Sequence, residues 1–158
     1  MKYKCENELN TMSFKDFNVL EISIDKDKLM LMTNGGVAKY DNSCNETLEE
    51  RYVSETEIRI MDAKIEAFYL EGGRYYNADD VLLKEEPDKP IEEDKYKETF
   101  KLLKGEDATL FFIGSSKQDD GSYVYEIAID VINDTYWIKL TGSRIIIEFD
   151  RFMNRVMN

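Results

Sequence analysis

The clearest β pattern in the sequence is YVYEIAIDVINDTYWIKL, residues 123–140. Apolar side chains recur in it at every second position, so that one face of an extended chain carries Tyr123, Tyr125, Ile127 and Ile129. Asn133-Asp134 favours a turn, after which the alternation resumes over residues 136–140. Alternation on both sides of a turn is typical of antiparallel strands with one buried face, so the stretch predicts two neighbouring strands.

The same alternation extends to the rest of the chain. It predicts further strands near residues 20–24, 29–32, 37–40, 58–60, 64–70, 110–113 and 145–149. Turns are expected at Asn34-Gly35-Gly36, Gly72-Gly73, Asp119-Asp120-Gly121 and Gly142-Ser143, where glycine accepts positive φ at little steric cost. VLEISID at 19–25 and VYEIAID at 124–130 agree at five of seven positions. Duplication of a three-strand meander explains this agreement, and so does the common composition of half-buried strands.

Helical signals are few. A spacing of i, i+4, i+7 joins Tyr96, Phe100 and Leu103, and with Pro90 before it and Gly105 after it this spacing predicts a helix near 91–104. The segment SCNE at 43–46 resembles a capping box and predicts a short helix that continues through Tyr52. A short C-terminal helix is expected after Asp150, with Phe152, Met153 and Val156 facing the sheet.

These signals predict a single α+β domain over residues 1–158, built mainly of antiparallel β meanders with about 8–10 strands. A β-sandwich or a partly open barrel is the alternative architecture. The segment 85–94 is charged and contains both prolines, which is typical of an exposed connection, here between two pseudo-repeat halves at 1–84 and 95–158. Because halves this small would be marginal alone, we expect one shared core.

Charge narrows the choice of partners. The chain has 21 basic and 33 acidic residues and no histidine, a net charge of −12. Residues 1–84 carry 17 acidic and 11 basic side chains and residues 85–158 carry 16 and 10, so each part contributes −6. A negative surface repels nucleic-acid phosphates and anionic lipids, so we expect neither nucleic acid nor membrane as a partner. Its sign suits a basic protein partner, and it also suits simple solubility.

Cysteine usage and hydropathy predict the compartment. Cys5 and Cys44 are the only cysteines, and we expect two free thiols, a single bridge being the alternative. The first six residues lack the apolar core of a signal peptide, and no apolar run approaches the roughly 20 residues of a membrane helix. The sequence therefore predicts a cytoplasmic protein.

Residues for catalysis are sparse. A Ser or Cys nucleophile needs a base within reach, and histidine, the usual base, is absent. The acidic pairs, such as Asp79-Asp80, do not fit the calcium-loop pattern, so they do not indicate a calcium site. Phosphates bind at the N-terminal ends of helices, whereas the Gly-Gly pairs lie between predicted strands. We therefore expect no catalytic residue, no metal site and no cofactor. A carboxylate- and metal-dependent hydrolase is the least favoured alternative.

Aromatic residues beside carboxylates are the remaining signal. Trp137 lies on the opposite face of its strand from Tyr136 and Ile138, and exposed Trp and Tyr beside carboxylates are good anchors for a basic surface. The predicted partner-binding residues are Trp137, Tyr75, Tyr76, Asp79, Asp80, Asp119 and Asp120. The alternative for Trp137 is a second core layer under the helix expected near 91–104.

The function predicted from the sequence is that of a non-catalytic, acidic protein-binding module. In composition, and in no particular motif, the chain resembles the small acidic immunity and antitoxin proteins that bacteria use against basic nuclease toxins. That likeness implies an inhibitor that masks the cationic surface of a basic toxin or nuclease without turnover. The second hypothesis is a small-molecule or peptide binder of unknown role, with its pocket between the sheet and the helix.

Overall fold

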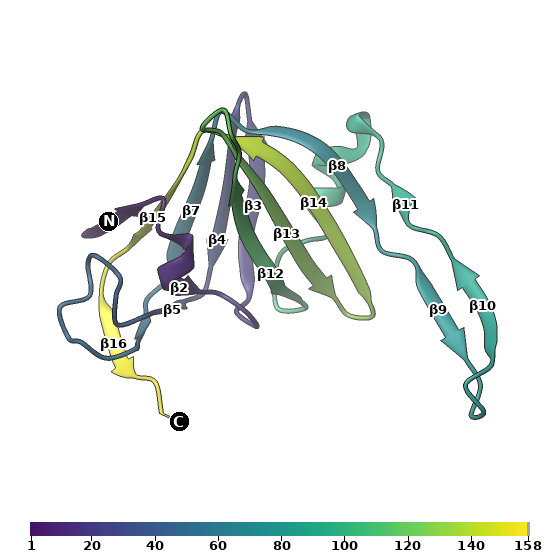
Figure 1. Cartoon of the computed structure of the whole chain (residues 1–158), viewed down its shortest axis with the longest axis horizontal. Helices are drawn as coiled ribbons and strands as arrows, with labels where there is room; N and C mark the ends of the chain where they lie inside the picture. Colours follow the sequence, from purple (N-terminus) through teal and green to yellow (C-terminus); the bar gives the residue numbers. More distant parts are fainter. Residues whose placement is uncertain (158) are drawn as a thin grey trace.

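Two five-stranded antiparallel sheets share one bent ribbon of two long strands (Figure 1). The computed structural model describes residues 1–157. One strand of the ribbon runs from β7 (Thr56–Met61) into β8 (Lys64–Leu70), and the other from β14 (Asp134–Gly142) into β15 (Arg144–Phe149). Pairing between them continues on both sides of the bend, from Thr56 opposite Phe149 to Leu70 opposite Tyr136. Each sheet therefore takes two inner strands from this ribbon.

The other strands extend the ribbon into sheet 1 and sheet 2. Sheet 1 has the order β1-β15-β7-β4-β3, with β1 (Tyr3–Glu6), β3 (Val19–Asp25) and β4 (Lys28–Thr33). Sheet 2 has the order β11-β8-β14-β13-β12, with β11 (Lys89–Pro90), β12 (Ala108–Lys117) and β13 (Tyr123–Val131). The edges β3 and β12 approach at one end, where the Leu110 N–H donates to the Phe17 carbonyl at 2.9 Å. In the described residues the sheets form no closed barrel.

The two sheets enclose one apolar core. The inward side chains of sheet 1 include Leu29, Leu31, Ile58, Ile60 and Ile147, and those of sheet 2 include Phe68, Leu110, Tyr125, Ile127 and Ile138. Most of them are the alternate positions that the sequence pattern assigns to a buried face. The strands of residues 1–84 and 95–158 interleave in both sheets, because β15 pairs with β1 and β7, and β8 pairs with β14. Duplication of a meander remains a prediction.

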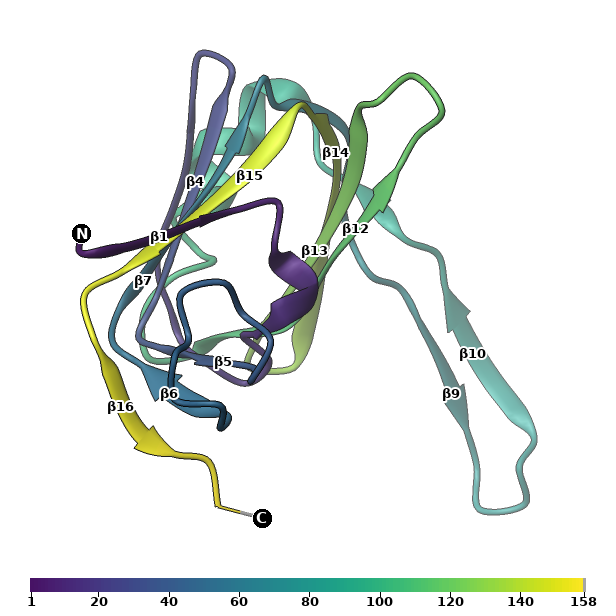
Figure 2. The ribbon, with the colours of Figure 1, turned by 60° about the vertical axis from the view of Figure 1, so that its left-hand side comes forward.

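A smaller four-stranded sheet packs at one end of the core (Figure 2). Its order is β16-β6-β5-β2, with β2 (Met12–Ser13) after a 3₁₀ turn η1 (Leu9–Thr11), β5 (Gly36–Ala38), β6 (Arg51–Val53) and β16 (Phe152–Arg155). The strand expected at 37–40 therefore pairs with β2 and β6 rather than continuing the meander of β3 and β4. Gly35 and Gly36 lack the positive φ expected of a glycine turn. Gly36 is instead required by close packing, since a Cβ there would lie 2.6 Å from the Phe14 ring.

Residues 71–88 extend sheet 2 beyond the body as an arm. Its hairpin consists of β9 (Gly73–Tyr76) and β10 (Leu82–Glu86), which pair only with each other. Gly72 does not form a turn as expected; it lies where β8 passes into β9, and its N–H donates to the Asp88 carboxylate at 2.8 Å. A Cβ at Gly72 would meet the backbone of Glu86 and Pro87. The close approach of these two segments therefore requires glycine.

The predicted helix at 91–104 is wrong in length. The structure has a 3₁₀ turn η2 (Glu93–Lys95) followed by α1 (Tyr96–Phe100), a five-residue helix. Strand pairing with β8 persists to Ile91, whose N–H donates to the Phe68 carbonyl at 2.8 Å and delays the helix. At its end Gly105 takes φ +106° and donates to the Val19 carbonyl, so the chain leaves the helix to pair with β3. Phe100 and Tyr96 still pack on Phe68, each with ring centroids 5.3 Å apart.

The other two predicted helices are also wrong. The C-terminal segment is strand β16, because Phe152 packs edge-on against Tyr3 and Phe149 while the backbone pairs with β6. Residues 43–50 form successive turns instead of a helix. There the buried Asn45 amide donates to the Glu49 carbonyl at 2.8 Å, a local bond that competes with helix formation.

We predict that Gly142→Ala destabilises the fold by about 1–3 kcal/mol, as overpacking does. The new Cβ would lie 2.6 Å from Ile60 Cγ2 and 3.0 Å from the Met61 carbonyl, at the bend of the ribbon. Urea unfolding measures the change. Ser115→Ala is the control, because its hydroxyl is exposed and forms no hydrogen bond among the described residues, so its loss changes stability by about 0.5 kcal/mol or less. Equal midpoints for Gly142→Ala and the wild type would contradict the tight packing at the bend.

We predict that Tyr125→Phe stabilises the protein by about 1 kcal/mol. The Tyr125 side chain is wholly buried and its hydroxyl has no hydrogen-bond partner among the described residues. Burial also raises the pKa of this phenol. Since removing an unpaired buried hydroxyl removes a desolvation penalty, the thermal midpoint should rise. A clear loss of stability would show that this hydroxyl is satisfied in solution.

Candidate protein-binding face

The outer face of sheet 2 carries a row of aromatic side chains. Cross-strand pairing aligns Phe112 of β12 with Ala128 of β13, Ala128 with Trp137 of β14, and Trp137 with Tyr69 of β8. These positions alternate with the buried residues Ile127, Ile138 and Phe68, so they point away from the core. We call Tyr69, Phe112, Ala128 and Trp137 the aromatic face.

Two rings of this face pack over the small residue between them. The centroids of Phe112 and Trp137 lie 6.0 Å apart. Ala128 is fully buried yet does not belong to the core cluster, because these rings cover it from outside. Phe112 itself remains 43% exposed. The face therefore combines apolar packing with open aromatic surface.

Carboxylates surround the aromatic face. Trp137 Nε1 donates to Glu71 at 3.2 Å, which ties the indole to the base of the arm. Burial raises the pKa of Tyr69 first, and the nearby negative charges of Asp88, Glu126 and Glu71 raise it further. These three carboxylates come from the arm and from β13, and together they give the aromatic row an acidic rim.

A hollow of about 240 Å³ lies on the same face beside Phe112. Phe112, Gly114, Ser115, Ser116, Val124 and Glu126 line it. Gly114 leaves room for the Phe112 ring, since a Cβ there would lie 2.6 Å from that ring. An apolar wall with one carboxylate at its rim suits the aliphatic stem and charged head of Lys or Arg.

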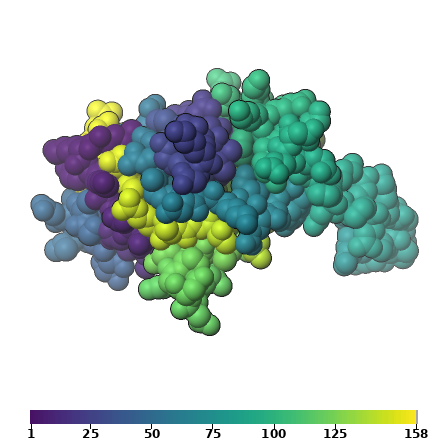
Figure 3. All heavy atoms as spheres, turned by 90° about the horizontal axis from the view of Figure 1, so that it is seen from above, coloured from purple at the N-terminus to yellow at the C-terminus, as the bar shows by residue number. Residues whose placement is uncertain are grey.

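The structure places the seven predicted residues on three parts of sheet 2 and its extension. Trp137 lies on the aromatic face. Asp119 and Asp120 lie at the tip of the β12–β13 hairpin, whereas Tyr75, Tyr76, Asp79 and Asp80 lie on the arm. Figure 3 shows both projections standing out from the body in different directions. Trp137 and the two aspartate pairs therefore do not form one patch.

Local chemistry explains both aspartate pairs. The Asp120 carboxylate accepts hydrogen bonds from the Ser122 hydroxyl at 2.6 Å and from its N–H at 2.9 Å, which lower the pKa of Asp120. Gly121 takes φ +89°, so the predicted Asp-Asp-Gly turn is confirmed. On the arm the Asn77 side chain organises the turn, since it accepts the Asp79 N–H at 2.8 Å. These bonds favour a structural role for the tips.

The arm exposes large side chains on both surfaces. Tyr75 is 51% exposed and carries the Lys84 ammonium 5.7 Å from its ring centroid. Tyr76 and Leu82 face each other across the hairpin, and both are also exposed. The predicted exposure of the two tyrosines is therefore confirmed, although they lie away from Trp137.

The helix does not cover Trp137. It packs on the inner face of sheet 2, at Phe68, whereas Trp137 lies on the outer face. The alternative of a second core layer under the helix is therefore wrong. Cys5 is buried and Cys44 partly exposed, both as free thiols, and burial raises the pKa of Cys5 to about 11. No three Cys, Asp or Glu side chains of residues 1–157 gather as a metal-binding group.

Comparison with known proteins assigns no family: no family model, no curated protein and no solved structure matches the chain. Among the described residues no helix is long and apolar enough to cross a membrane. The aromatic face must therefore be interpreted from its own geometry.

Sequence reasoning found Trp137 but missed its neighbours. Tyr69 and Glu126 share the outward parity of their strands, so alternation alone could have found them once the strands were aligned. Phe112 could not be found in this way, because a register shift between Leu110 and Phe112 changes the alternation of β12.

We predict that Phe112→Ala shifts the fluorescence of Trp137, the only tryptophan, to longer wavelength and increases its quenching by acrylamide. Removal of the ring uncovers the indole. The matched control is Phe111→Ala, because Phe111 is also 43% exposed but packs against Lys15, 5.5 Å from its ring centroid. Identical spectra for both variants would argue against the Phe112–Trp137 contact.

Proposed function

We propose that this protein is a non-catalytic binding module that docks a basic protein through the aromatic face. The observation that carries the proposal is the partly exposed aromatic row with carboxylates of Glu71, Asp88 and Glu126 around it. Tryptophan, tyrosine and phenylalanine rings attract Lys and Arg through their faces, and adjacent carboxylates strengthen the attraction. A surface of this composition favours a cationic partner over an apolar or anionic one.

The overall charge supports the same partner. With a net charge of −12 the protein attracts a basic surface over a distance of several ångströms and accelerates its approach. The hollow beside Phe112 offers a place for one Lys or Arg side chain at the centre of the contact, where binding energy usually concentrates. Long-range attraction and a local anchor would thus act together.

The partner we propose is a basic toxin or nuclease, with this protein as an inhibitor of the immunity or antitoxin type. Covering the cationic cleft with which such an enzyme holds nucleic acid would block it without any reaction. The same proposal places the protein in the cytoplasm, where both free thiols would stay reduced.

The test neutralises the carboxylates around the aromatic face and keeps the size and shape of their side chains. In the rim variant Glu71→Gln, Asp88→Asn and Glu126→Gln are combined, and octa-arginine serves as the cationic probe. We predict that the variant binds octa-arginine at least about tenfold more weakly by calorimetry, the loss expected for two or more charge-assisted contacts.

The matched control combines Glu46→Gln, Glu50→Gln and Glu55→Gln, three exposed glutamates that form no ion pair within 4.0 Å among the described residues, and it changes net charge equally. It should bind the probe within about twofold of the wild type. Equal weakening in both variants would show that net charge alone attracts the probe, and the aromatic face would lose its role. In lysate capture at low salt, the specific partner should be basic and absent only from the rim variant.

A further inference from the structure

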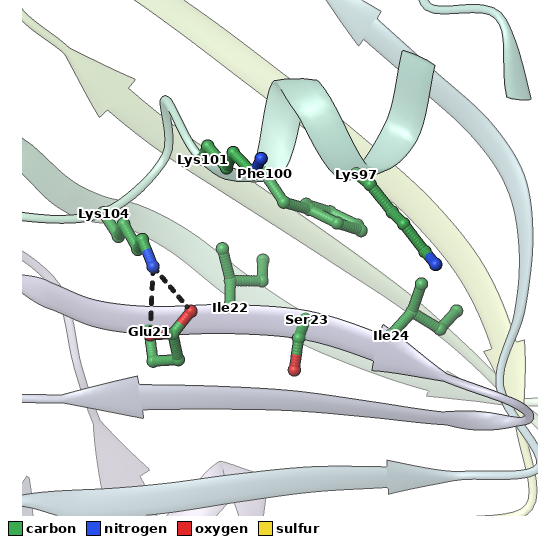
Figure 4. A pocket seen from close by; sticks show the side chains of 8 residues that line it. All are labelled: Glu21, Ile22, Ser23, Ile24, Lys97, Phe100, Lys101 and Lys104. Carbon is green, nitrogen blue, oxygen red and sulfur yellow. Dashed lines mark hydrogen bonds and ion pairs between the residues drawn. The ribbon is translucent and has the colours of Figure 1, made fainter. Parts of the chain in front are cut away.

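A groove beside α1 carries the reverse charge. It lies between the edge strand β3 and the segment that contains α1 (Figure 4), and its volume is about 270 Å³. We propose that this groove binds a small amphipathic carboxylate, an acid with a short apolar chain. The proposal is independent of the protein-binding function, because the groove shares no lining residue with the aromatic face.

The floor of the groove is apolar. Ile22 and Ile24 project from β3 toward α1, and the Phe100 ring projects from α1 toward β3 (Figure 4). Ile22 and Phe100 are almost fully buried and belong to the core cluster, so this floor is fixed by the fold. Ile24 is only partly buried, so the floor is rigid at Ile22 and Phe100 and accessible at Ile24, where the apolar chain of a ligand packs.

The rim of the groove is cationic. Lys97, Lys101 and Lys104 line it, and the first two form no ion pair within 4.0 Å in the part of the chain that the structure describes. Lys104 Nζ is held by both oxygens of Glu21 at 3.1 Å, which closes one end of the groove. Two ammonium groups thus remain to receive an anion beside an apolar floor.

The acidic surface elsewhere does not prevent this binding. At physiological ionic strength charges are screened over about 8 Å, whereas a carboxylate in the groove would touch the lysines directly. The same consideration excludes a large polyanion, since its distant charges would extend over the acidic surface. A single carboxylate on a short chain therefore fits better than a nucleic acid or an acidic protein.

The experiment is a titration of the ¹⁵N-labelled protein with octanoate, with octanol as the neutral probe and acetate as the anion without a chain. We expect octanoate to shift the amide signals of residues 22–24 and 97–104 in a saturable manner. Octanol and acetate should bind at least about tenfold more weakly, because octanol lacks the carboxylate and acetate lacks the apolar chain. Octanol binding as tightly as octanoate, or shifts confined to other regions, would overturn the proposal.

Two double variants distinguish direct binding by Lys97 and Lys101 from an effect of net charge. Lys97→Gln combined with Lys101→Gln should weaken octanoate binding by about tenfold, whereas Lys64→Gln combined with Lys117→Gln, an equal change in net charge at exposed sites, should leave it within about twofold. Both variants should melt like the wild type, since all four side chains are exposed. Equal effects of the two pairs would overturn the proposal, and so would binding of octa-glutamate but not octanoate in the groove.

Discussion

The bend of the shared ribbon determines how the two five-stranded sheets face each other. At the bend the Ser143 N–H donates to the Met61 carbonyl at 2.9 Å, and the Ser143 hydroxyl donates to Asp62 at 2.5 Å. Asp62 takes φ +53°, and Gly142 lets β14 pass close to Ile60. The bend turns the inner faces of both sheets toward one another, so that a single sequence pattern of period two produces a two-layer core.

The outer face follows from the same strands. Because successive side chains of a strand point to opposite faces, burial of Ile138 and Ile127 in the core forces Trp137 and Ala128 outward. The β8 strand continues past the body into the arm, and this continuation brings Glu71 to Trp137. The acidic rim and the aromatic row are thus consequences of one ribbon that builds the core on its other side. The edge strand β3 of sheet 1 has a different environment, because α1 lies beside it and brings lysines there.

Much of the strand pattern could be predicted from the sequence, because burial on one face leaves a period-two signal. Lys64–Leu70 is a strand with the predicted bounds, and the inward positions of Tyr125, Ile127 and Ile138 are confirmed. The path of the chain between sheets could not be predicted. A bend at Gly142 and a turn at Gly142 have the same residue signature, and what distinguishes them is the partner strand β7.

The helices were predicted wrongly, and the neighbours of Trp137 were not predicted, for related reasons. Local spacing favours a helix at 152–156, but burial of Phe152 against Tyr3, which lies far away in sequence, makes it a strand. The neighbours of Trp137 depend on the register of four strands and on one irregularity near Phe111. No local pattern contains that information, so the sequence could not predict which side chains surround Trp137.

A map of amide chemical-shift changes on adding an arginine-rich peptide to the ¹⁵N-labelled protein tests directly whether the aromatic face binds basic partners. If the aromatic face binds a basic partner, the shifts should be saturable and centred on Tyr69, Phe112, Glu126 and Trp137, with little change at the two hairpin tips or around α1. Shifts spread evenly over all acidic regions, or centred on Asp79-Asp80 and Asp119-Asp120, would contradict it.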